Sequence, residues 1–127
     1  MKRLWIAAGI LLALCAATAA NVLCIANLAR HTVDTLTQAQ ASAEAGDWDR
    51  AVELTRQAEH SFQEQSFYLH ITLRHSDIDT VEIAFQEVEQ LLLHRERLGE
   101  YAAANTRLIT QVHLLAESES FTLKNIL

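Results

Sequence analysis

One stretch constrains the fold of this chain more than any other: no residue from Leu4 to Ala29 is charged. A helix rises about 1.5 Å per residue, and the hydrocarbon core of a bilayer is about 30 Å thick. The stretch is therefore long enough, as a helix, to cross a membrane. The sequence predicts one N-terminal transmembrane helix.

Basic residues at the start of the chain predict its orientation. Lys2 and Arg3 precede the apolar stretch, and positive side chains beside a span remain on the cytoplasmic side. We expect a single-pass protein of the cell membrane with a cytoplasmic N-terminus. Residues 1–29 are then the membrane anchor, and residues 30–127 form an extracytoplasmic domain.

A cleaved signal peptide is the alternative interpretation of the same stretch. Ala17-Thr18-Ala19 resembles a signal-peptidase site, with cleavage after Ala19 or Ala20. Against cleavage, apolar residues continue from Val22 to Ala29. An uncleaved anchor is favoured, and the cleaved form stays open.

Small residues recur along the predicted span with helical spacing. They fall at successive i+4 positions, which place them on one face: Gly9, Ala13, Ala17 and Asn21. Such a stripe lets a second transmembrane helix approach closely. Alanine-rich signal sequences also produce this spacing by chance, so a partner helix in the membrane is a hypothesis.

The part of the chain after the anchor is acidic and lacks helix breakers. Two of the ten basic residues precede the stretch and all sixteen acidic residues follow it, so the exterior carries a net charge of −8 against −6 for the whole chain. This balance argues against nucleic-acid partners. Both cysteines lie in the anchor, and the chain has no proline and three glycines. We expect an all-α domain without disulfides.

Apolar residues spaced three and four apart predict that the anchor helix continues outward to about Ala45. At the first turn, Gly46 suits a helix C-terminus, Asp47 suits the next N-cap, and Trp48 is expected to fill the core beside it. A second helix is predicted from about Trp48 to His75.

Two further turns complete the predicted fold. Ser76 and Asp77 are expected to begin a third helix. Gly99 is expected to end it after Leu98, with a fourth helix over about 100–118; if Gly99 is tolerated, the two helices fuse. The prediction is a small up-and-down bundle of three to four helices.

Residues 45–58 resemble the turn and second helix of a tetratricopeptide repeat. The likeness lies in Ala45-Gly46-Asp47-Trp48 and in Ala58. No second copy follows at the family's repeat length, so we expect one hairpin of this type without the concave groove of a repeat array.

A second resemblance covers nearly the whole chain. Its elements are a Gly-Asp-Trp turn at 46–48, His-x-Asp-Ile-Asp at 75–79, acidic residues at 117 and 119, and Leu-Lys-Asn-Ile at 123–126. With the short N-terminal span, these resemble the family of domain of unknown function 4363, a bacterial group of single-span proteins. The resemblance implies an extracytoplasmic helical domain and implies no activity.

One cluster of possible metal ligands lies at the predicted second junction. It comprises His70, His75, Asp77 and Asp79, of which His75 and Asp79 are one helical turn apart. Helix capping explains the acids without a metal, so these are weak candidates and we expect no bound metal or cofactor.

Signals for catalysis are absent from the sequence outside the anchor. It has no cysteine there, no glycine-flanked serine and no phosphate-binding loop, so we expect no enzymatic activity. The leading hypothesis is a membrane-anchored extracytoplasmic interaction module that acts through a protein partner, such as another membrane protein. The alternative is a ligand or metal sensor read out by such a partner; the sequence does not predict the process or the oligomeric state.

Overall fold

The computed structural model describes the backbone of residues 1–72 and 75–126, and the side chains of residues 1–65 and 78–118. The described part is all-α, with four helices and no strand. In chain order they are α1 (Lys2–Glu44), α2 (Trp48–Thr72), α3 (His75–Leu93) and α4 (Leu98–Ile126). The predicted all-α fold is confirmed.

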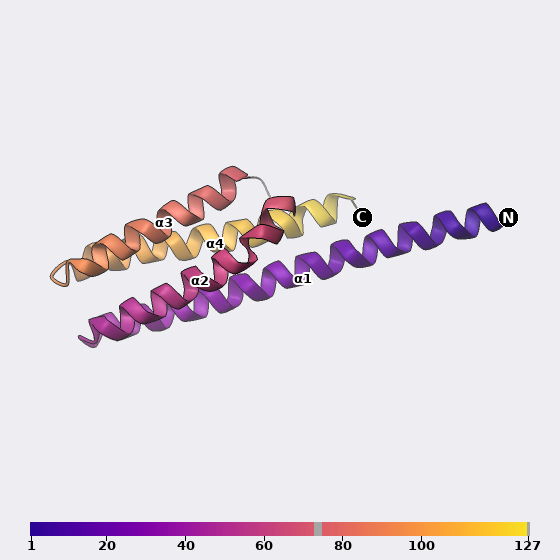
Figure 1. Ribbon diagram of the computed structural model, residues 1–127. Helices are drawn as coiled ribbons and strands as arrows, with labels where there is room; N and C mark the ends of the chain where they lie inside the picture. The colour runs from indigo at the N-terminus through magenta and orange to yellow at the C-terminus, as the bar shows by residue number, and fades with distance from the viewer. Residues whose placement is uncertain (73–74, 127) are drawn as a thin grey trace.

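The helices run up and down as a bundle. α1 packs beside α2 and α4, and α3 packs beside the same two helices. α1 is much the longest and projects beyond the other three at its N-terminal end (Figure 1). The predicted continuation of the apolar helix into the bundle is thus confirmed.

The first turn closes α1 and opens α2. The N–H of Gly46 donates to Ala43 O at 3.0 Å and that of Asp47 donates to Ser42 O at 2.8 Å. This closing pattern needs a residue with positive φ, and Gly46 supplies it with φ 86°. The Asp47 carboxylate then accepts the N–H of Arg50 at 3.2 Å, which caps α2.

The predicted break at Gly99 is wrong, and so is the fused alternative. α3 ends at Leu93, and α4 begins at Leu98. The N–H of His94 donates to Leu91 O and that of Arg97 donates to His94 O, both at 3.1 Å. The polar run from His94 to Arg97 offers no side chain for the core, whereas Gly99 lies in the first turn of α4.

The pattern of burial in α2, the second helix of the α1–α2 hairpin, recurs fifty residues later in α4, the second helix of the α3–α4 hairpin. Residues 48–62 and 98–112 show the same order of buried, half-buried and exposed positions. The buried pairs are Ala51 and Tyr101, Leu54 and Ala104, Thr55 and Asn105, Ala58 and Leu108, and Phe62 and Val112. The bundle is therefore built from two similar hairpins whose matching positions differ in side-chain size.

Large side chains of α2 and α3 fill the middle of the core. Phe62 and Phe85 are almost fully buried, with ring centroids 5.9 Å apart. Trp48 is half-buried and meets Tyr101 edge-on, with centroids 6.1 Å apart.

Replacement of Phe85 by alanine should destabilise the bundle severely. The buried ring leaves a cavity, and such substitutions cost about 3 to 5 kcal/mol. Ile83→Ala, on the same helix but 64% exposed, is the matched control and should change the free energy of unfolding by less than about 0.5 kcal/mol. Urea unfolding of the full chain in mild detergent, followed by circular dichroism, measures both. Equal effects would contradict the described core.

Candidate functional site: the groove between α2 and α3

The seam between α1 and α4 is closed. Asn105 is fully buried there, and its amide donates to Leu36 O at 3.1 Å and to Gln40 Oε1 at 3.0 Å. An amide held by two acceptors on the facing helix fixes how α4 lies against α1.

The seam between α2 and α3 is open, in contrast. A groove of about 700 Å³ runs along it, and we call it the α2–α3 groove. The residues that line it are Asp49, Val52, Glu53, Arg56, Gln57, His60, Leu92, Leu93 and Arg95. A smaller hollow of about 140 Å³ adjoins it, lined also by Glu89 and Gln90.

The floor of the α2–α3 groove is apolar. Val52 is half-buried and Leu92 is buried, but Leu93 is 66% exposed. Single exposed leucines are common on protein surfaces. Leu93 differs because it continues an apolar floor inside a groove, where a second apolar surface would find contact area.

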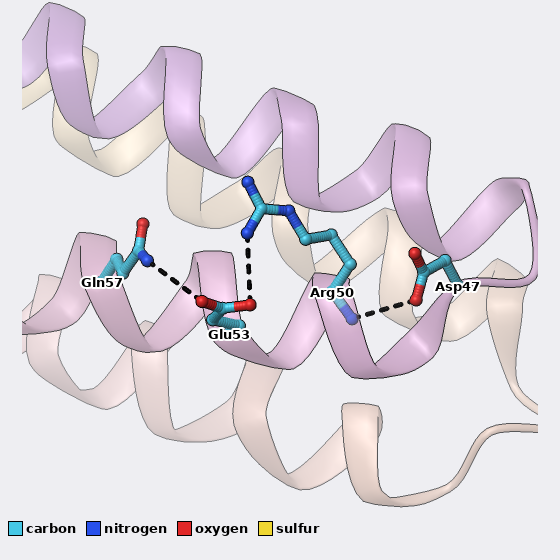
Figure 2. A network of polar contacts seen from close by, with 4 residues as sticks. All are labelled: Asp47, Arg50, Glu53 and Gln57. Carbon is cyan, nitrogen blue, oxygen red and sulfur yellow. Dashed lines mark hydrogen bonds and ion pairs between the residues drawn. The ribbon is translucent and has the colours of Figure 1, made fainter.

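The rim of the groove is charged but largely paired. Arg95 Nη2 lies 2.6 Å from Asp49 Oδ1, which joins the turn after α3 to the start of α2. Glu53 accepts from Arg50 at 3.1 Å and from Gln57 at 3.5 Å. Figure 2 shows the Arg50–Glu53 and Glu53–Gln57 contacts, which follow the Asp47 cap along α2. Exposed pairs like these are worth little stability, so a partner can exchange them at low cost.

Two carboxyl groups meet across the same seam. Glu59 of α2 shares a hydrogen bond with Glu89 of α3, and both side chains are half-buried. This hydrogen bond, then burial and the charge of Glu89, raise the pKa of Glu59 from 4.5 to about 7, although Arg56 and Gln63 lower it. Two carboxylates in contact repel, so the Glu59 carboxyl keeps its proton up to about neutral pH.

A second perturbed group lies deep in the core. Burial raises the pKa of Tyr101 to about 12; the nearby Thr55 hydroxyl lowers the value and the Glu44 charge raises it. Neither the Tyr101 nor the Thr55 hydroxyl makes a hydrogen bond of normal geometry. Tyr101 therefore stays protonated and has no role as a base at physiological pH.

The predicted membrane-packing stripe lies on the projecting part of α1. Gly9, Ala13 and Ala17 are exposed, and Asn21 is half-buried. A Cβ added at Gly9 would meet no atom within 4 Å. The packing role of the stripe stays a prediction.

The weak metal candidates are not brought together by the described side chains. Asp79 is exposed, whereas the side chains of His70, His75, Ser76 and Asp77 lie outside the described set. Among the side chains that are described, no three His, Cys, Asp or Glu residues are grouped closely enough to hold a metal ion.

Sequence reasoning missed the groove residues. One signal was present: Leu91, Leu92 and Leu93 are consecutive, and a helix cannot bury three successive side chains on one face. The facing of Glu59 and Glu89 depends on how α2 lies against α3, which no spacing within either helix reveals.

The Glu59 pKa predicts how stability depends on pH. Between pH 4.5 and about 7 the folded chain keeps a proton that the unfolded chain releases, so the free energy of unfolding falls as the pH rises through this window. Glu59→Gln keeps a donor for Glu89 and removes that slope. At about pH 8 the free energy of unfolding of the variant should exceed that of the native chain by about 1 kcal/mol, a value discounted for solvent screening.

Urea unfolding at about pH 5 and about pH 8 measures the slope. Glu53→Gln is the control, because Glu53 is exposed and paired only within α2. A Glu59→Gln variant with the native slope would contradict the raised pKa of Glu59.

Comparison with known proteins agrees with the resemblance drawn from the motifs. Residues 21–126 match the family model described as Domain of unknown function (DUF4363). The chain matches no curated protein and no solved structure. The matched range includes all of α2, α3 and α4 and every buried residue of α1. Since this range is well over half of the sequence, the chain belongs to the DUF4363 family.

Proposed function

We propose that this protein is a membrane-anchored interaction module that binds a protein partner in the α2–α3 groove. One observation carries the proposal: Leu93 is 66% exposed on an apolar floor between two helices. Grooves of this kind bind an amphipathic helix, which places its apolar face on the floor.

The anchor supports the proposed setting. α1 is, in the part of the chain that the structure describes, the one helix long and apolar enough to cross a membrane. With Lys2 and Arg3 retained in the cytoplasm, the groove faces the extracytoplasmic side. The partner is then another extracytoplasmic or membrane protein that the anchor holds nearby.

The rim indicates the kind of helix that fits. Arg56 and Arg95 stand beside Asp49 and Glu53 around the floor, so both signs of charge are offered. A helix with a narrow apolar stripe flanked by mixed charges matches this arrangement better than a uniformly charged one.

Site-specific photo-crosslinking tests the proposal. A benzophenone amino acid at position 93 should give a discrete adduct in the native membrane, whereas one at position 83 should give none. Ile83 is the matched control because it is 64% exposed outside the groove. Val52→Lys, which charges the floor, should lower the adduct at position 93 at least about tenfold, a loss equivalent to about 1.4 kcal/mol. Equal adducts at both positions would contradict a groove partner.

A ligand or metal sensor is the second candidate function. The volume of the groove, about 700 Å³, lies within the usual range for small-molecule sites. Thermal unfolding of the full chain with divalent metals and small extracytoplasmic metabolites separates the two functions. A saturable rise in melting temperature that Arg56→Ala removes would favour a sensor, and no rise would favour the protein partner.

A further inference from the structure

Arg56 differs from the other arginines around it in having no ionic partner. Four arginines of α2, α4 and the turn between α3 and α4 each pair with a carboxylate, at 2.6 to 3.5 Å: Arg50, Arg95, Arg97 and Arg107. Arg56 forms no ion pair with any side chain that the structure describes. In an exterior with an excess of acidic residues, a cation left without a carboxylate needs an explanation.

The position of Arg56 is at the centre of the α2–α3 groove. The groove and the smaller hollow beside it share four lining residues: Val52, Arg56, Leu92 and Leu93. Val52 lies one helical turn before Arg56, so the two side chains stand on the same side of α2. Arg56 and Leu93 are both exposed. A helix that covers the apolar floor therefore meets the guanidinium as well.

The two carboxyl groups nearest to Arg56 along α2 are engaged elsewhere. Glu53 and Glu59 lie three residues before and after it, where helical neighbours can pair. Glu53 instead accepts a hydrogen bond from Arg50 at 3.1 Å. Glu59 shares a hydrogen bond with Glu89, and its pKa of about 7 leaves it little negative charge below neutral pH. The chain therefore supplies no carboxylate that neutralises Arg56.

We propose that Arg56 binds an aspartate or glutamate of the partner helix, one turn away from the apolar residues that this helix places on the floor of the α2–α3 groove. The inference rests on the proposed function and adds the chemistry by which the groove selects its partner. A guanidinium binds a carboxylate through two parallel hydrogen bonds, and apolar surroundings strengthen such a pair. A helix without an acidic residue there would cover Arg56 and leave it unpaired, so the groove rejects it.

Photo-crosslinking through position 93 measures the contribution of Arg56 to binding. In the full chain with a benzophenone amino acid at that position, Arg56→Gln should lower the adduct in native membranes about tenfold, because it removes a charge-assisted pair. Arg107→Gln is the matched control, since Arg107 is an exposed arginine of α4 that pairs with Glu87 outside the groove. It should leave the adduct unchanged.

A water-soluble carbodiimide identifies the group that meets position 56. The reagent joins an amine to a carboxylate in direct contact, and the only lysines of the chain are Lys2 and Lys124. Arg56→Lys keeps the positive charge and adds one amine in the groove. The lysine at position 56 should couple to an aspartate or glutamate of a second protein, with apolar residues three or four positions away. Arg107→Lys should give no adduct with another protein.

The two experiments separate failure of this inference from failure of the proposed function. An adduct at position 93 that Arg56→Gln leaves unchanged, with no carbodiimide adduct at position 56, would keep the groove partner and overturn the role of Arg56. Coupling at position 56 to a small carboxylic acid alone would overturn the partner helix and favour a sensor. No adduct at position 93 with arginine at position 56 would overturn the proposed function, and with it this inference.

Discussion

The packing of one face of α1 is the interaction on which the rest of the structure depends. That face is built mostly from small side chains. Its buried residues are Ile25, Leu28, Ala29, Thr32, Thr35, Leu36, Ala39 and Ala43. Alanine and threonine let neighbouring backbones come close. Accordingly, the close packing between α1 and α2 is more extensive than that between α3 and α2. The same helix carries the apolar stretch, so the candidate membrane span and the bundle-packing face belong to one helix.

The difference between the two seams follows from these side chains. α3 buries larger residues, among them Phe85, Val88 and Leu92, which occupy the space that α2 would need for close contact. The α1–α4 seam is fixed by Asn105, whereas the α2–α3 seam has the Glu59 and Glu89 carboxyls facing each other. A seam that is wide, rimmed by both signs of charge and floored by leucine is where we propose that a partner binds. The raised pKa of Glu59 predicts that the stability of the fold also depends on pH.

Much of the fold could be predicted because it depends on patterns of residues that are close in sequence. The uncharged run predicted α1, and Gly46 with Asp47 predicted the first turn, since positive φ and an N-cap are properties of single residues. The end of α3 could not be placed in the same way. Gly99 is a helix breaker by propensity, yet the chain turns at His94 to Arg97 because burial ends at Leu92.

The candidate site was less accessible to sequence reasoning because it depends on pairs of helices. From sequence alone, Leu93 is indistinguishable from a core leucine. The structure shows that Leu92 is buried and Leu93 is exposed. The similarity of the two hairpins was hidden for a related reason: matching positions such as Ala51 and Tyr101 share burial but not size. Packing conserves total volume across a core rather than the identity of each position.

We propose that α1 is retained as one helix from the membrane into the bundle. Trypsin cuts after Arg3 and Arg30, so the retained anchor yields the peptide Leu4–Arg30. Mass spectrometry of the protein isolated from its native membrane measures this directly. A retained helix predicts the intact Leu4–Arg30 peptide. A peptide that instead begins at Ala20 or Asn21 would show that the span is removed, and would contradict a helix shared by membrane and bundle.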